Sequence, residues 1–170
     1  MRRYASFFEW PDKARKELGV VEELVKALNR DQFAGYGAPE SFSPDPPDCI
    51  CTNPLGEKVA FEVVEVVCEV AARMNAQGND VFRNWVRGEL TEHVSGLLAQ
   101  KDSKTFHGGP YASVVVCLFT DEPLLTIDRL ELELAGKLFG PYEQVDRAYL
   151  VVSYDPSTKT YPVVELNLLK

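Results

Sequence analysis

The sequence predicts a single α/β domain in which helices flank a central mixed β-sheet. Helix-like and strand-like segments alternate along the chain in the order α-β-β-β-α-β-α-β-β. The 170 residues, of which 45% are hydrophobic, are enough to bury one sizeable core. No stretch resembles a linker long enough to separate two domains, so we expect residues 1–170 to form one unit.

The first predicted element is an amphipathic helix over about residues 13–29, which Asp12 can cap. At about 100° per residue, its apolar side chains share one face. Glu17 falls on that same face, so we expect an acid on the core side of this helix. Residues 32–36 then favour a short strand, which is followed by a loop rich in Gly and Pro.

A β-hairpin is expected around the turn-forming residues 53–56 (Asn-Pro-Leu-Gly). Its first strand covers Cys49–Thr52, and Asp48 opens it. Its second strand covers Lys58–Val67 and is unusually apolar. This hairpin is the part of the chain around which we expect the others to be arranged.

Two acids interrupt the apolar second strand. Glu62 and Glu65 stand among Val, Ala and Phe residues, where a carboxylate is rarely buried without a partner. Because they are three residues apart, they point to opposite faces of a regular strand. The partner of Glu62 is either a metal ion or a base in a structural ion pair. The candidate bases are Lys101, Lys104 and Arg147.

A helical turn over residues 69–75 is expected next, followed by a long helix to about Lys104 that Asn79 or Asp80 can cap. The apolar stripe of the long helix leads to Lys101 and Lys104. Lysines in this place also suit the helix dipole, and both can extend past the core to water.

The rest of the chain continues the alternation of strands and helices. We expect a buried strand over residues 112–120, a helix over 127–139, a strand over 145–154 and a last strand over 161–168. The two most apolar strands, residues 59–67 and 112–120, should lie adjacent at the centre of the sheet, covered by the long helix.

The composition limits the partners of the protein. The formal charge of −8 means that the surface as a whole does not attract nucleic acid, so any phosphate binding must be local. Four cysteines are too few for a disulfide scaffold and predict reduced, buried thiols. The N-terminus lacks an apolar h-region and no apolar run approaches about 18 residues, so we expect a cytoplasmic protein without membrane association.

The element order, with Pro47-Asp48 and then Glu62 inside VAFEVVE, resembles the PD-(D/E)XK nuclease superfamily, which has the restriction-endonuclease-like fold. The resemblance covers most of the chain as a succession of elements, and its motif rests on three or four residues. It implies that Asp48 and Glu62 bind Mg²⁺ or Mn²⁺ and approach within about 4–6 Å of each other. In the family pattern a catalytic lysine lies two residues after the second acid, where this sequence has Val64.

The resemblance implies roles for further residues. Some members of the superfamily supply the lysine from the following helix, and Lys101 or Lys104 could take that part here. Lys101 is favoured because apolar residues at spacings of four, three and four lead to it. Family members often contribute a glutamate from the first helix, and Glu17 fits that position. Glu65 is a further supporting acid, and the implied function is metal-dependent hydrolysis of phosphodiesters in nucleic acid.

Other functions remain open on the same residues. The missing strand lysine and the acidic charge favour a catalytically degenerate relative that serves as a protein- or nucleic-acid-binding module. The acidic face could also bind a basic protein, and Asp48 could simply cap a turn after two prolines. A nuclease should carry a rim of basic residues around its acids, whereas a module should not. The candidates for that rim are Arg73, Arg83, Arg87, Lys101 and Lys104.

Overall fold

The computed structural model describes residues 12–78 and 84–169. In these two ranges the helices are α1 (Lys13–Asp31), α2 (Glu69–Ala76), α3 (Glu89–Asp102) and α4 (Ile127–Leu134). The strands are β1 (Glu40–Ser41), β2 (Cys49–Thr52), β3 (Lys58–Glu65), β4 (Ser113–Thr120), β5 (Leu138–Phe139), β6 (Arg147–Val152) and β7 (Val163–Leu168). The predicted alternation is present, the helical turn expected over residues 69–75 is α2, and β5 is an addition to the predicted order.

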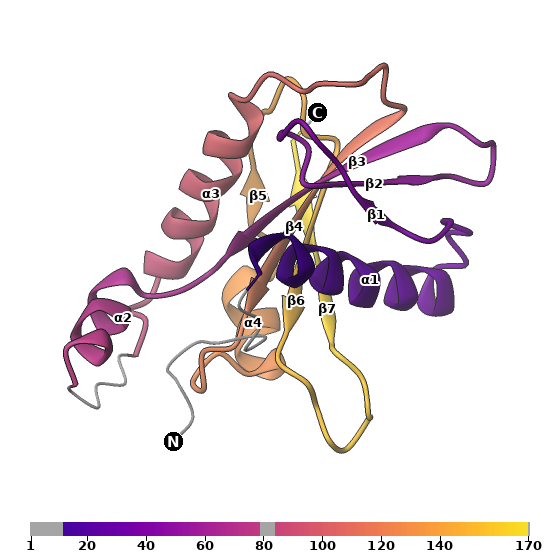
Figure 1. Ribbon diagram of the computed structural model, residues 1–170. Coiled ribbons are helices and arrows are strands. Elements are labelled where there is room, and N and C mark those ends of the chain that lie inside the picture. Colours follow the sequence, from indigo (N-terminus) through magenta and orange to yellow (C-terminus); the bar gives the residue numbers. More distant parts are fainter. Residues whose placement is uncertain (1–11, 79–83, 170) are drawn as a thin grey trace.

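The described strands join one mixed sheet in the order β1-β2-β3-β4-β6-β7-β5 (Figure 1). The central strands β3 and β4 run parallel, with Glu62 opposite Val116. β4 also pairs in parallel with β6, whereas β2 and β3 form an antiparallel hairpin. The α/β class and the central, adjacent positions of the two most apolar strands are therefore confirmed.

The two faces of the sheet carry separate apolar cores. α1 covers one face, where Leu24 and Phe61 belong to the same buried cluster (Figure 1). α3 and α4 cover the other face, where Leu98 and Leu118 belong to a second cluster. Complete burial of such a side chain contributes on the order of 1.5–3 kcal/mol. α1 and α3 consequently stand on opposite sides of β3, and both can direct side chains toward its edge.

The predicted strand over residues 32–36 is wrong. Phe33 and Gly35 have left-handed φ values of 52° and 68°, which an extended strand does not accommodate. A Cβ atom on Gly35 would lie 2.8 Å from Cγ of Pro54, so the contact with the hairpin turn also requires glycine. The segment is therefore an irregular connection, and the first strand is the short β1.

The long helix begins later than predicted. Its proposed caps, Asn79 and Asp80, lie outside the described residues, and residues 84–88 are not helical. Gly88 has a left-handed φ of 87°, and α3 begins at Glu89 directly after it. The backbone conformation of one glycine thus separates α3 from the preceding segment, although the apolar periodicity runs through both.

The buried carboxylate of Glu122 forms hydrogen bonds to the segment that precedes α3. Glu122 is 2% exposed and accepts a hydrogen bond from Trp85 Nε1 at 2.5 Å. It also accepts one from the backbone N–H of Cys68. Because both of its oxygens meet donors, the burial of this acid is compensated. Glu122 therefore has a structural role: it links the end of β4 to the residues that precede α2 and α3.

The predicted helix over residues 127–139 ends early, at Leu134. Gly136 follows with a left-handed φ of 66°, which interrupts the helix. The chain then forms β5, which pairs in parallel with residues 167–168 of β7. The predicted strands over residues 145–154 and 161–168 are present in shortened form as β6 and β7.

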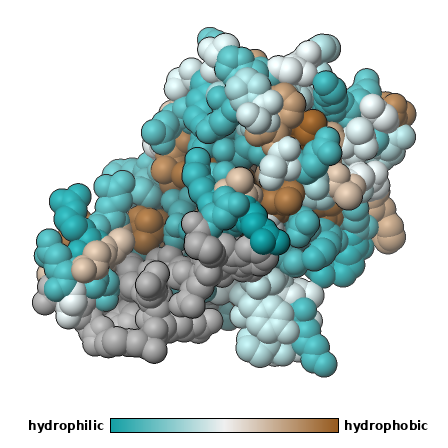
Figure 2. Space-filling view, viewed as in Figure 1, coloured by the Kyte–Doolittle hydropathy of each residue, from teal (hydrophilic) through white to brown (hydrophobic). Residues whose placement is uncertain are grey.

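The polarity of the surface and the burial of the cysteines are those expected from the sequence composition. Figure 2 shows one face of the molecule, on which hydrophilic residues predominate and apolar residues form small separate patches. None of the helices in residues 12–78 and 84–169 has the length and apolar character needed to cross a membrane. The thiols of Cys49, Cys51 and Cys117 are reduced and buried, as predicted, and Cys68 is buried as well.

Candidate metal centre

The β2–β3 hairpin brings the two predicted acids together. Asp48 precedes β2, and Glu62 lies in the middle of β3. Carboxylate oxygens of Asp48, Glu62 and a third acid, Asp45, all lie within 4.8 Å of one another. The predicted approach of Asp48 to Glu62 is therefore confirmed. We call these three acids, with Lys101 and Lys104, the acidic centre.

The backbone of the neighbouring strand fixes Asp48. Its N–H donates to the carbonyl oxygen of Phe61 at 3.1 Å, and its Oδ2 accepts from the N–H of Val63 at 2.7 Å. The ladder of β2 and β3 begins with Cys49 opposite Phe61, so the Val63 N–H lies beyond the last pair. At this position the Asp48 carboxylate accepts the hydrogen bond that a carbonyl of the neighbouring strand would otherwise accept. This bond fixes the orientation of the Asp48 side chain. This strand-edge contact replaces the turn cap considered for an Asp after two prolines.

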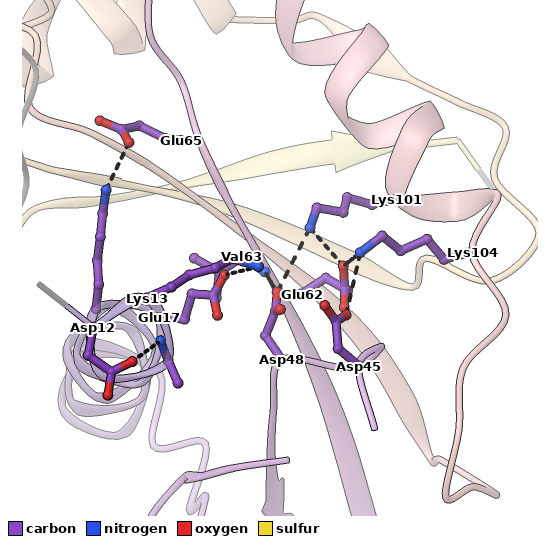
Figure 3. Close-up of polar contacts among 12 residues, drawn as sticks. Asp12, Lys13, Glu17, Asp45, Asp48, Glu62, Val63, Glu65, Lys101 and Lys104 are labelled. Atoms are coloured by element: carbon purple, nitrogen blue, oxygen red, sulfur yellow. Dashed lines mark hydrogen bonds and ion pairs between the residues drawn. The ribbon is translucent and has the colours of Figure 1, made fainter. Parts of the chain in front are cut away.

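Glu62 is completely buried on the α3 side of the sheet. Its Oε2 accepts hydrogen bonds from Lys101 Nζ and Lys104 Nζ, both at 2.7 Å (Figure 3). Its Oε1 is buried and has no hydrogen-bond partner among the described residues. An unsatisfied buried acceptor is unfavourable by about 1–3 kcal/mol, and more when charged. This oxygen therefore remains available to a ligand.

Two lysines reach the acids from the C-terminal end of α3 (Figure 3). Lys101 lies in the last helical turn, its side chain is 10% exposed, and its Nζ is also 3.8 Å from Asp48 Oδ2. Lys104 lies after the helix, its side chain is 31% exposed, and its Nζ is 3.7 Å from Asp45 Oδ1. Both lysines to which the apolar stripe of the long helix leads therefore reach the side chain of Glu62. The structural ion pair considered for Glu62 is thus also formed.

Asp45 is the member of the centre that sequence reasoning missed. Its side chain is 52% exposed, and it belongs to the Pro-rich segment that leads into β2. It stands three residues before Asp48 in the sequence Asp-Pro-Pro-Asp. Two acids at that spacing, separated only by prolines that restrict the backbone, are the signal that could have identified it.

Glu17 faces the acidic centre from α1 (Figure 3). Its side chain is 14% exposed, and its Oε1 lies 3.2 Å from Lys13 Nζ. Burial raises the pKa of Glu17 and the charge of Asp48 raises it further, whereas Lys13 lowers it. The core-side position predicted for Glu17 is therefore borne out, and its charge interacts with that of Asp48 across the edge of the sheet.

Two of the candidate residues lie away from the centre. Glu65 points to the face opposite Glu62, as its spacing predicts, and its Oε2 is 2.9 Å from Lys16 Nζ. Arg147, considered as a partner of Glu62, instead contacts Glu165 at 3.0 Å. Glu65 and Arg147 therefore belong to separate ion pairs.

The basic rim is only partly present at the acids. Lys101 and Lys104 contact them directly, whereas Arg87 precedes the first turn of α3, and a 14-residue helix is about 21 Å long. Arg73 lies on α2, and Arg83 lies outside the described residues. A lysine of α1 contributes instead. The pKa of Lys13 is raised, first by its hydrogen bond to Glu17 and also by the charges of Asp48 and Asp45.

The donor set fits a hard divalent cation. Mg²⁺ and Mn²⁺ take oxygen ligands, and Asp48, Glu62 and Asp45 offer carboxylate oxygens within reach of a single ion. The unpartnered Oε1 of Glu62 is a buried acceptor in this group. Cys49 follows Asp48 in the chain, but burial raises the pKa of its thiol to about 12, and a hard cation prefers the oxygen ligands of the three acids.

The surroundings of Asp48 disfavour the ionised form of its carboxyl. Burial raises its pKa, the Val63 N–H counteracts this shift, and the charge of Glu62 adds to it, with a net increase. A carboxyl with a raised pKa in the folded protein stabilises the fold below its unfolded pKa, and this contribution is lost as the pH rises through the folded pKa. Without a cation, ionised Asp48 is therefore unfavourable near neutral pH.

Replacing Asp48 with asparagine should accordingly raise the melting temperature of the metal-free protein at pH 7, on the order of a few °C. The amide oxygen can still accept the Val63 N–H, and the charge is removed. The difference from the parent should shrink as the pH falls toward about 4, the ordinary pKa of an Asp carboxyl, because a raised pKa makes the parent carboxyl take up its proton more readily. Thermal melts followed by circular dichroism in a chelator, over this pH range, measure the effect.

Asp31→Asn is the matched control, because Asp31 is exposed and Arg30 lowers its pKa. It should not raise the melting temperature at pH 7. A lower melting temperature for Asp48→Asn than for the parent at pH 7 would contradict the electrostatic account of the centre.

No family model, curated protein or solved structure matches this chain. The resemblance to the PD-(D/E)XK superfamily therefore stays a prediction from the sequence.

Proposed function

We propose that the protein is a divalent-metal-dependent phosphodiester hydrolase that acts on nucleic acid, a divergent member of the PD-(D/E)XK superfamily with the restriction-endonuclease-like fold. One observation carries the proposal. Glu62 is completely buried beside Asp48 and Asp45, one of its oxygens binds two lysines, and the other has no partner among the described residues. Buried carboxylate oxygens in purely structural networks are usually hydrogen-bonded, so an unpartnered oxygen in this group of acids favours a ligand.

The charges of the centre suit a cation together with a phosphate. Four carboxylates interact here: those of Glu17, Asp45, Asp48 and Glu62. Three ammonium groups accompany them, those of Lys13, Lys101 and Lys104. With every group ionised, one negative charge is left over. A divalent cation and one phosphodiester would bring the total to neutral, which favours binding of the two together.

Each part of the centre has a task in hydrolysis. When bound, Mg²⁺ or Mn²⁺ polarises the phosphate and lowers the pKa of a coordinated water. Asp48 and Glu62 would hold the cation, and Asp45 would complete the set from the solvent side. The oxygen of water forms a bond to phosphorus, the bond to the leaving sugar oxygen breaks, and a proton passes to that oxygen. Lys101, fixed between Glu62 and Asp48, would offset the negative charge that develops on the phosphoryl oxygens.

The second candidate is a catalytically degenerate relative that acts as a binding module for protein or nucleic acid. Two ammonium groups at 2.7 Å from one oxygen already neutralise Glu62 without a cation, and Val64 occupies the usual place of the lysine. In this function the two lysines form a permanent ion-pair network with the acids, and no metal ion binds. The two functions differ in their response to divalent cations.

Millimolar Mn²⁺ or Mg²⁺ should raise the melting temperature of the parent protein. A ligand at about 100 times its Kd stabilises the folded state by about 2.7 kcal/mol. For a chain of this size that corresponds to about 5–10 °C. Glu62→Gln should abolish the increase, since it removes a charged ligand. Differential scanning fluorimetry with and without metal measures both proteins.

Glu65→Gln serves as the matched control, because Glu65 lies on the opposite face and pairs with Lys16. Its melting temperature should still rise with metal. An unchanged melting curve of the parent at millimolar Mn²⁺ would favour the binding module over the hydrolase.

A further inference from the structure

Lys104 contacts the acids from just beyond α3, to which its backbone is tied by one hydrogen bond, from its own N–H to the carbonyl oxygen of Lys101 at 3.3 Å. It stands two residues beyond the end of α3. Its ammonium nevertheless lies 2.7 Å from Glu62 Oε2, and the interaction with Glu62 raises the pKa of Lys104 although burial opposes this. A long, flexible side chain holds one position only if its own backbone is held, because ordering it reduces its conformational entropy.

A glutamine from a distant part of the chain holds that backbone. The side-chain amide Nε2 of Gln144 donates a hydrogen bond to the carbonyl oxygen of Lys104 at 2.7 Å. The same nitrogen donates to the carbonyl oxygen of Asp102, the last residue of α3. One amide group therefore binds two carbonyls at the point where the chain leaves the helix.

Asp102 in turn holds the segment that carries Gln144. Its Oδ1 accepts the backbone N–H groups of Gln144 at 2.7 Å and Val145 at 3.0 Å, and its Oδ2 accepts that of Glu143 at 3.0 Å. Burial raises the pKa of Asp102, but these N–H groups lower it by more. The carboxylate stays charged and binds the segment through each of its oxygens.

The segment is anchored to the central sheet. Val145 is buried in the core beneath α3. The N–H of Asp146 donates to the carbonyl oxygen of Val114 at 2.9 Å, and its Oδ2 accepts the Val114 N–H at 2.8 Å. Val114 belongs to β4, the strand next to the one that carries Glu62. The hydrogen bonds thus connect the sheet to Lys104 through Gln144.

We propose that Asp102 and Gln144 are positioning residues, which hold Lys104 at the solvent side of the acidic centre for contact with a substrate phosphate. This inference rests on the proposed hydrolase. The two lysines differ in setting: the Lys101 side chain is 10% exposed and is placed by the helix, whereas that of Lys104 is 31% exposed and is placed by Gln144. Both ammonium groups contact Glu62, and the more exposed one, that of Lys104, is within reach of an incoming anion.

Labelling of lysines tests the positioning without any activity. Gln144→Met keeps the size of the side chain and removes its two N–H donors. Trace acetylation with acetic anhydride, read for each lysine by mass spectrometry, should show Lys104 labelled about fivefold faster in this variant and Lys101 unchanged. Gln100→Met, the same change at an exposed glutamine of α3, should leave both lysines as in the parent. No increase at Lys104, or an equal increase at both lysines, would overturn the inference.

Cleavage kinetics test the consequence for the substrate. Gln144→Met should lower kcat/KM for nucleic acid about tenfold in the parent, chiefly through KM, and should have no further effect in the Lys104→Met background. The same loss in both backgrounds would make Gln144 a general stabilising residue and overturn the inference. A parent that cuts no nucleic acid would refute the proposed hydrolase, whereas the labelling result would still decide whether Gln144 positions Lys104.

Discussion

Replacing Lys101 with methionine should lower the rate of phosphodiester cleavage by about 10²-fold or more, the scale observed when a group that stabilises developing charge is removed. Lys101 combines burial, a 2.7 Å contact with Glu62 and a 3.8 Å approach to Asp48. Methionine retains most of its apolar contacts and removes the charge. The measurement is cleavage of labelled single- and double-stranded DNA and RNA in Mg²⁺ or Mn²⁺.

Lys137→Met is the control for this loss, since Lys137 is exposed and lies beyond α4. Its activity should equal that of the parent. If the parent protein leaves all four nucleic acids uncut in both metals, the catalytic function is wrong and the binding module becomes the better account. Equal rates for the parent and Lys101→Met would reject the role given to Lys101 alone.

Replacing Glu62 with leucine should lower the free energy of unfolding by about 3–5 kcal/mol, because it leaves the Lys101 ammonium buried without its closest partner. The double variant Glu62→Leu/Lys101→Met should recover most of that loss. Two apolar side chains of similar size can replace a buried ion pair at little or no cost in stability. Urea unfolding followed by circular dichroism compares the three proteins.

Lys104 should tolerate the double change, since its side chain is 31% exposed and can turn to water. The result would separate two contributions of Glu62, one to stability and one to function. If Glu62→Leu alone is as stable as the parent, Glu62 is not the buried partner of Lys101 in solution.

Most of the acidic centre could be predicted from local patterns. The resemblance to the PD-(D/E)XK superfamily implied that Asp48 and Glu62 meet, and the hairpin gives the physical reason, because a short turn fixes which residues of its strands are neighbours. Lys101 followed from helical periodicity, because it lies within α3, where about 100° per residue still holds. Both patterns are short-range, and both are visible in the sequence.

The remaining features depend on contacts that no local pattern encodes. The stripe of the long helix also indicated Lys104, but Lys104 lies beyond α3, and the hydrogen bond that its backbone accepts comes from Gln144, 40 residues away. The predicted strand over residues 32–36 failed because Phe33, unlike most non-glycine residues, adopts a left-handed backbone conformation. The long helix begins only after Gly88, which also adopts a left-handed backbone conformation, although the apolar periodicity on both sides of it favours a continuous helix.

The lysines on Glu62 have a consequence for the proposed metal centre when no cation is bound. In proteins such as zinc fingers, the ligands lack any other partner, and the chain unfolds when the ion is lost. Here Lys101 and Lys104 supply counter-charge to Glu62 when no ion is present. Loss of the cation would thus abolish the proposed activity without unfolding the chain. The activity would return on metal binding without a refolding step.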